Sequence, residues 1–232
     1  MTPIRRAVVT ASAALFCGVA SSQPFQPAVY LPIAASVVRV VAEVDAGRQS
    51  VGSGVTVAPT VIVTNCHVVR DAVSIRVSAG GSTWHVDAES GDSRHDVCFL
   101  RVPGWAGRPV PMSGTDAPEV GSTVVALGFT AGSPIKPRVG NVRALHEFEG
   151  ARVIEADAAF NSGASGGGLF DEDGALVGLL TFRRRNSTTS YYALPVQWVR
   201  QGLPRDDQWK SVEPLEGDAP FWNVESAASA PF

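Results

Sequence analysis

The chain has 232 residues, 45% of them hydrophobic and 18% charged, which supplies enough apolar surface for a sizeable core and excludes a wholly disordered protein. The net charge is −3 and no basic run exceeds three residues. This argues against a nucleic-acid partner, because phosphate neutralisation supplies much of the affinity of such proteins. The 23 Gly and 16 Pro residues are spread along the chain and favour short strands joined by turns.

The N-terminus has the pattern of an export signal. Arg5 and Arg6 precede Ala7–Ala20, an apolar stretch too short to span a bilayer, and small residues follow it. We expect Met1–Ser22 to be removed by cleavage before Gln23, with cleavage after Ala20 as a rival. An uncleaved N-terminal anchor is the alternative. The signal predicts an exported chain, periplasmic or secreted, whose mature part is not stably inserted in the membrane.

Strand patterns dominate the rest of the chain. Runs rich in β-branched residues end at Gly or Pro, and only Val196–Gln201 has a convincing, short helical pattern. The expected strands are Ser36–Val44, Ser50–Val57, Thr60–Thr64, Val73–Ser78, Thr83–Ala88, Asp96–Val102, Thr123–Phe129, Arg138–Leu145, Arg152–Ala156, Ala175–Phe182 and Thr188–Leu194.

Residues 103–121 are rich in Pro and Gly and divide these strands into two groups, so we interpret them as a linker. Strands at this spacing with frequent turns are typical of all-β sandwiches and barrels. We expect one barrel over about 36–102 and a second over about 122–195. The tail, 201–232, either docks on the barrels or is mobile.

Three segments carry residues suited to catalysis. Thr64–Val69 (TNCHVV) places a histidine at the end of an apolar strand, His95–Val97 (HDV) opens another, and Asn161–Gly168 (NSGASGGG) surrounds a serine with glycines. Glycines let a substrate approach the backbone and let adjacent N–H groups converge as an oxyanion hole. A serine hydroxyl needs a neighbouring base, and the base needs an orienting carboxylate.

Each segment alone is weak, since Gly-rich serine loops, lone histidines and strand-opening aspartates are common. The order His, Asp, Ser is far more specific, with the first two in one predicted barrel and the serine in the other. The predicted active site therefore lies between the barrels, where pockets commonly form.

The segments GSGVTVAPTVIVTNCHVV, HDVCFLRV, GSPIKPRVGNVRAL and DAAFNSGASGGGLFDEDGALVGLLTF resemble those of trypsin-like serine proteases of the chymotrypsin fold, closest to the bacterial HtrA/Deg-type branch. The resemblance covers about Ser36 to Arg200, within a protease domain that we expect over 29–200. It implies two six-stranded antiparallel β-barrels and hydrolysis of peptide bonds through an acyl-enzyme.

The resemblance also implies residue roles. Ser165 corresponds to the nucleophile, His67 to the general base and Asp96 to the carboxylate that orients it. The N–H groups of Gly163 and Ser165 correspond to the oxyanion hole. Ala164 departs from the aspartate found there in digestive enzymes, so we expect no activation through an ion pair with a new N-terminus.

The predicted substrate pocket lacks a carboxylate. Ala159 stands six residues before Ser165, where Lys- or Arg-specific relatives carry aspartate, and Phe160 follows it. The pocket is therefore expected to be shallow and to favour small or apolar side chains at P1. Thr181 and Phe182 are expected to continue the strand that pairs with the substrate backbone.

That strand is followed by Arg183, Arg184 and Arg185. These arginines either form a solvated loop or give the enzyme a preference for acidic substrates. His85, His95 and His146 are interpreted as surface or core histidines.

Cys66 and Cys98 are the cysteines left after removal of the signal, and an exported protein with two cysteines favours one disulfide. Because they neighbour His67 and Asp96, which must touch, the two are expected to be close. In extended strands, however, Cys66 would point away from His67 while Cys98 would share a face with Asp96. Two free buried thiols remain the alternative. No paired ligand spacing indicates a metal, and no cofactor is expected.

The predicted function is therefore an exported serine endopeptidase with polypeptide substrates. A catalytically silent peptide-binding module and an esterase with the same triad are the alternatives. The residues after Arg200 are too few for a regulatory PDZ domain, so we expect a protease unit without one. The natural substrate and the oligomeric state do not follow from the sequence.

Overall fold

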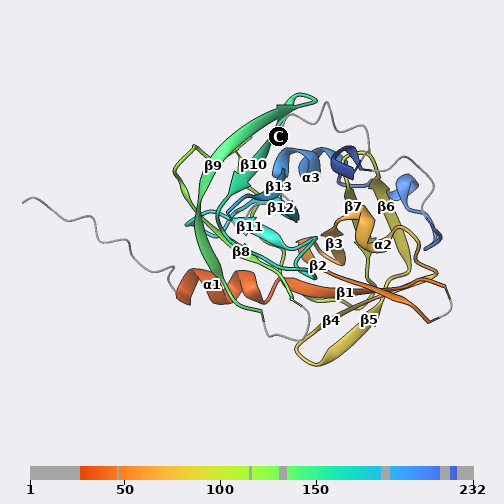
Figure 1. Cartoon of the computed structure of the whole chain (residues 1–232). Coiled ribbons are helices and arrows are strands. Elements are labelled where there is room, and N and C mark those ends of the chain that lie inside the picture. Colours follow the sequence, from red (N-terminus) through yellow and green to blue (C-terminus); the bar gives the residue numbers. More distant parts are fainter. Residues whose placement is uncertain are drawn as a thin grey trace, which may run out of the picture.

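The computed structural model describes residues 27–45, 47–114, 117–130, 135–183, 189–214 and 220–223. The expected export signal, Met1–Ser22, lies outside these residues. Two groups of strands lie side by side, as Figure 1 shows, and the all-β fold class expected from the sequence is confirmed.

The first half forms a seven-stranded antiparallel sheet in the order β5-β4-β1-β2-β3-β7-β6. Apolar residues form a buried cluster on this sheet, and Val38, Ile62 and Leu100 within it are completely buried. The strands are β1 (Val37–Glu43), β2 (Gln49–Ala58), β3 (Val61–Thr64), β4 (Ser74–Ala79), β5 (Ser82–His85), β6 (Ala88–Asp92) and β7 (Val97–Arg101).

The second half is a closed six-stranded barrel in the order β10-β13-β12-β11-β8-β9. Closure leaves every strand with two neighbours, which removes the unpaired edges of an open sheet. The strands are β8 (Thr123–Leu127), β9 (Arg138–Phe148), β10 (Ala151–Ala156), β11 (Gly168–Phe170), β12 (Leu176–Arg183) and β13 (Tyr191–Pro195).

The two strands that the sequence did not predict have weak signals. β6 has the sequence AESGD, without β-branched residues, and β11 has only three residues, GLF. β6 pairs with β7 and makes the first half a seven-stranded open sheet instead of a closed barrel of six strands. β11 completes the second barrel by joining β8 to β12.

Helices are short. The predicted α3 (Val196–Gly202) is present, and α1 (Pro27–Ala34) and α2 (Cys66–Val69) were not predicted. Two 3₁₀ turns, η1 (Asp206–Gln208) and η2 (Phe221–Asn223), follow α3. None of the helices in the described part of the chain combines the length and hydropathy that crossing a membrane requires.

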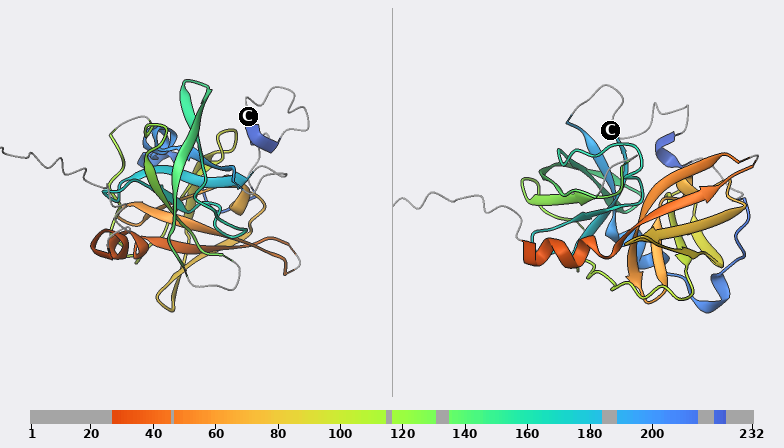
Figure 2. Two further views of the ribbon diagram at one scale, coloured as in Figure 1. Left: turned by 60° about the vertical axis from the view of Figure 1, so that its left-hand side comes forward. Right: turned by 90° about the horizontal axis from the view of Figure 1, so that it is seen from below.

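One hydrophobic cluster joins the two halves. It combines Val63 and Phe99 of the first sheet with Leu179 and Tyr192 of the barrel, and Trp198 of α3 packs into it. No named strand occurs in the described part of the expected linker, 103–121, although Met112 forms an isolated bridge with Leu176. Figure 2 shows the two halves side by side.

The C-terminal segment docks on both halves where it is described. Lys210 forms an antiparallel bridge with Glu89 of β6, and Trp209 lies over the Arg101 guanidinium at 5.5 Å. Farther along, Phe221 is 8% exposed and stacks on Phe148 with ring centroids 4.3 Å apart. Both described parts of the tail therefore pack on the rest of the protein.

Candidate active site

His67 lies on α2, the single helical turn that follows β3. The turn is fixed by burial of Cys66, Val68 and Val69, while the His67 side chain stays 28% exposed. Gly52 of β2 is required here, because a Cβ at that position would lie 2.6 Å from Val68. The helical turn therefore holds a partly exposed imidazole on a buried backbone segment.

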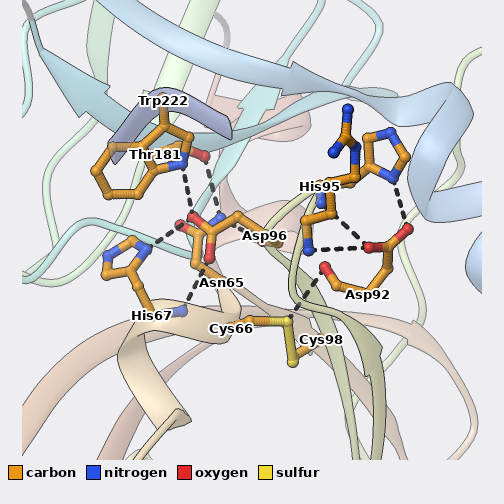
Figure 3. Close-up of a disulfide and its surroundings, with 10 residues drawn as sticks. Asn65, Cys66, His67, Asp92, His95, Asp96, Cys98, Thr181 and Trp222 are labelled. Atoms are coloured by element: carbon orange, nitrogen blue, oxygen red, sulfur yellow. Dashed lines mark hydrogen bonds and ion pairs between the residues drawn. A yellow bond between two sulfur atoms is a disulfide. The ribbon is translucent and has the colours of Figure 1, made fainter. Parts of the chain in front are cut away.

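Asp96 has a completely buried carboxylate directed at His67 (Figure 3). Its Oδ2 lies 2.8 Å from His67 Nδ1, and its Oδ1 accepts the His67 backbone N–H at 2.8 Å. The Asp96 backbone has φ +59°, in the left-handed region that aspartate tolerates better than most residues. This conformation precedes β7 and turns the carboxylate toward α2.

Asn65 connects this pair to the barrel, a role that the sequence analysis missed. Its buried Nδ2 donates to the Asp96 carbonyl and to Thr181 Oγ1, both at 3.0 Å. The Cys66 N–H also donates to the Asp96 carbonyl, at 3.4 Å. The backbone of Asp96 is therefore held from α2 and its N-cap, and the same amide reaches β12.

Ser165 lies in the Gly-rich loop before β11, and the loop packs tightly on the first sheet. Gly163 and Gly166 have φ +95° and +83°, conformations that other residues rarely adopt. A Cβ on Gly166 would lie 2.2 Å from the Ser53 carbonyl and 3.1 Å from the Asn65 nitrogen. The serine loop is therefore adjacent to the segment that carries His67.

Ser53 of β2 holds this loop with two hydrogen bonds and joins it to Phe129 with a third. Its N–H donates to the Ser165 carbonyl at 2.7 Å, and its hydroxyl donates to the Gly163 carbonyl at 2.8 Å. The same hydroxyl accepts the Phe129 N–H at 2.8 Å. The only sequence signal for this residue is its place in the GSG segment.

The Ser165 hydroxyl donates to the Thr181 carbonyl at 3.1 Å. Within the described ranges no hydrogen bond joins it to His67, so the structure brings His67 and Asp96 into contact and places Ser165 nearby. The N–H groups of Gly163 and Ser165 donate to no other residue of the described chain. Both remain available to an incoming carbonyl oxygen.

The residues predicted to line the substrate pocket have different environments. Ala159 is exposed, whereas Phe160 is 9% exposed and packs against Tyr191 at 5.2 Å between ring centroids. Thr181 and Phe182 lie in β12, with Thr181 buried and Phe182 stacked on Tyr192. Arg183 ends β12, and Arg184 and Arg185 lie outside the described residues.

Cys66 and Cys98 are bonded to each other, with their Cα atoms 4.9 Å apart (Figure 3). The side-chain directions expected from extended strands do not apply, because Cys66 lies in α2 and not in a strand. The pair connects α2 to β7, directly beneath His67 and Asp96.

His95, next to Asp96, belongs to a separate charged cluster. Its Nδ1 lies 2.5 Å from Asp92 Oδ2 and its Nε2 lies 2.8 Å from Glu149 Oε2. Burial alone would raise the pKa of Asp92, but hydrogen bonds from His95 and Arg94 outweigh it and lower the pKa. The cluster links the first sheet to the β9–β10 hairpin.

Trp222 of η2 is a further neighbour of the site that the sequence analysis missed. Its Nε1–H donates to Asp96 Oδ2 at 3.1 Å, and its ring meets the His67 ring edge-on with centroids 5.3 Å apart. The sequence signal that could have found it is its place beside Phe221 in a tail otherwise rich in small and acidic residues.

Residues 52–179 match the family model of the trypsin-like peptidase domain. The chain belongs to the trypsin-like peptidase family. Among curated relatives it is 36% identical over 131 residues to Protease Do-like 1, chloroplastic, of Arabidopsis thaliana, and 35% identical over 137 residues to a probable periplasmic serine endoprotease DegP-like of Ectopseudomonas mendocina. These alignments cover 52% and 56% of this chain but only 30% and 29% of the relatives. The chain therefore spans less than a third of their length.

Solved structures of this family support the fold. The active form of the Rv3671c protease from M. tuberculosis matches with a TM-score of 0.72 and 22% identity, covering 92% of this chain and 99% of that one. The serine endoprotease from Yersinia pestis matches with a TM-score of 0.67 and 26% identity, covering 75% of this chain and 63% of that one. The expected chymotrypsin-like fold and the resemblance to the HtrA branch of trypsin-like peptidases are confirmed.

Proposed function

We propose that this trypsin-like peptidase is an exported serine endopeptidase in which Ser165 is the nucleophile, His67 the general base and Asp96 the orienting carboxylate. The single observation that carries the proposal is the contact of His67 with Asp96, in which the buried carboxylate accepts both Nδ1–H and the backbone N–H of the histidine. This pair fixes the tautomer that leaves Nε2 free to accept a proton.

Catalysis requires the Ser165 hydroxyl to turn from the Thr181 carbonyl toward His67 Nε2. The hydroxyl can turn about the Cα–Cβ bond, and catalytic hydrogen bonds at such serines are often loose before substrate binds. Ser165 Oγ then attacks the carbonyl carbon while His67 takes its proton. The oxyanion accepts hydrogen bonds from the N–H groups of Gly163 and Ser165, and Asp96 stabilises the imidazolium.

His67 next gives this proton to the leaving amine, and the acyl-enzyme forms as the peptide bond breaks. Water then attacks the acyl carbon with His67 again as base, which releases the acid and restores Ser165. Every proton that leaves an attacking oxygen passes through His67. This balance needs no group beyond the chain, the substrate and water.

We propose small or apolar residues at P1. Ala159 offers no carboxylate to a basic side chain, and the Phe160 ring fills space between the loop and Tyr191. Polypeptide substrates and export follow the names of relatives such as the periplasmic serine endoprotease of Ectopseudomonas mendocina. A cleavage profile with Lys or Arg dominant at P1 contradicts this preference.

A fluorophosphonate probe tests the proposed chemistry directly. We expect it to label the wild-type chain at Ser165, to label His67→Ala far more slowly, and to leave Ser165→Ala unlabelled, with the modified peptide located by mass spectrometry. His85→Ala is the matched control, because His85 is exposed on β5. An unlabelled wild type would favour the silent peptide-binding module, and hydrolysis of esters without cleavage of any peptide would favour the esterase.

A further inference from the structure

Trp222 comes from the end of the described chain, yet it contacts both members of the acid–base pair. We propose that Trp222 is a positioning residue for the triad, which holds Asp96 and His67 in their working geometry through its indole N–H. This inference rests on the proposed function, because it assigns Trp222 a role at the same site. The contacts are drawn in Figure 3.

Three N–H donors surround the Asp96 carboxylate. Oδ1 accepts the backbone N–H of His67, and Oδ2 accepts both His67 Nδ1 and Trp222 Nε1. A buried carboxylate is costly unless its oxygens are hydrogen-bonded, and bonds to a charged acceptor are the strong ones. The indole N–H therefore completes the coordination of the oxygen on which the histidine depends.

The Trp222 ring also contacts rings on two sides. The Trp222 ring stands at 85° to the His67 imidazole, with centroids 5.3 Å apart. It also stacks on Phe182 of β12, with centroids 5.3 Å apart and an angle of 21°. Such edge and stacked contacts restrict ring motion, so Trp222 restrains His67 from one side while β12 supports Trp222 itself.

The residues immediately before Trp222 anchor this contact. Pro220 and Phe221 are buried, and Phe221 packs between Phe148 and Trp198, with centroids 4.3 Å and 5.8 Å away. The Phe221 N–H donates to the Arg94 carbonyl at 3.2 Å. Because the preceding residues are fixed on both halves of the molecule, the indole is delivered to Asp96 at low cost in entropy.

The test compares Trp222→Phe, which keeps an aromatic ring but removes the N–H, with wild type on one peptide substrate. We expect kcat to fall roughly tenfold and KM to stay within about twofold. The reason is that loss of a hydrogen bond to a charged group raises the activation barrier by about the amount that corresponds to a tenfold change in rate. Trp209→Phe is the matched control, since Trp209 is also in the tail but packs over Arg101. We expect it to retain wild-type kcat, and thermal unfolding of all three chains shows that each is folded at the assay temperature.

Three kinetic results overturn the proposal. An unchanged kcat in Trp222→Phe removes the positioning role. A rise in kcat, in this variant or in Trp222→Ala, shows that the residue obstructs the site. A change confined to KM shows that it only borders the substrate.

A second measurement does not depend on turnover. In the Ser165→Ala chain labelled with ¹⁵N, the Trp222 indole N–H resonance is assigned by its loss in Trp222→Phe. We expect this resonance to move when Asp96→Asn removes the charge of its acceptor, while the Trp209 resonance stays. An unmoved Trp222 resonance overturns the contact. If the fluorophosphonate probe does not label the wild-type chain, the proposed function is contradicted. The NMR result on Trp222 stands independently of that outcome.

Discussion

The two halves of the molecule hold their candidate catalytic residues differently. In the first half, His67 and Asp96 are held by a disulfide, a buried amide and two direct hydrogen bonds. In the barrel, Ser165 lies in a loop between strands, and the hydrogen bonds that fix the loop come partly from Ser53 of the other half.

This difference shows which parts of the site depend on the interface. The acid–base pair is assembled within one half, by α2 and the residue before β7. The nucleophile loop takes its position from both halves, because Gly166 and Ser53 must meet across the boundary. Disturbing the interface should therefore affect Ser165 before it affects His67.

Removing the nucleophile has the largest expected effect. Ser165→Ala should lower turnover of a peptide substrate at least about a thousandfold, as loss of a triad member does in comparable enzymes. Ser162→Ala is the matched control in the same loop, because Ser162 is exposed. Peptidase activity at the wild-type level in Ser165→Ala would end the assignment.

The crosslink in the first half should dominate its stability. The disulfide closes a separation of 32 residues, and replacing both cysteines with alanine should lower the free energy of unfolding by about 3–4 kcal/mol. Urea unfolding of the double variant measures this. Cys17, the third cysteine of the sequence, lies in the expected signal Met1–Ser22, so the comparison uses a Cys17→Ser chain. The thiol count of this chain should rise by two on reduction, and a count unchanged by reductant would refute the crosslink.

The tail contact at Glu89 should make stability depend on pH. Glu89 is 2% exposed and accepts the Glu213 N–H at 3.3 Å; burial raises its pKa to about 7. The folded chain then keeps a proton that the unfolded chain loses, so this residue lowers stability as the pH rises from about 4.5 to 7.

Glu89→Gln removes this dependence, because an amide stays neutral. We expect the variant to unfold at a free energy on the order of 2 kcal/mol above wild type at pH 8, and to differ little from it near pH 4.5. Urea unfolding at both pH values gives the comparison, and Asp87→Asn, on the surface nearby, is the control. Equal stabilities at pH 8 would show that Glu89 is not held neutral.

The smallest expected effect tests the link between the halves. Ser53→Ala removes the hydroxyl that joins Gly163 to Phe129 and should lower kcat by roughly tenfold, because the oxyanion loop loses a buried partner. Ser50→Ala in the same strand is the control. A variant of Ser53 with wild-type kcat would show that the barrel holds the loop without help.

The predicted strands were recovered from their β-branched runs, because such patterns depend on local sequence. The missed strands lack that pattern: β6 is polar and Gly-containing, and β11 is too short to show a period. Each becomes a strand only because a neighbour offers unpaired backbone groups, β7 for the first and β8 with β12 for the second. Pairing across the sheet overrides weak local preference.

The sequence by itself determined the all-β class and located the segments that carry His67, Asp96 and Ser165, and it predicted a division near residues 103–121. Motif order and spacing are local properties, so they can be seen without coordinates. Only the tertiary structure decided that Asn65, Ser53 and Trp222 belong to the site. Each acts through a hydrogen bond to a residue distant in the chain, and which distant groups meet depends on how the two halves and the tail pack together.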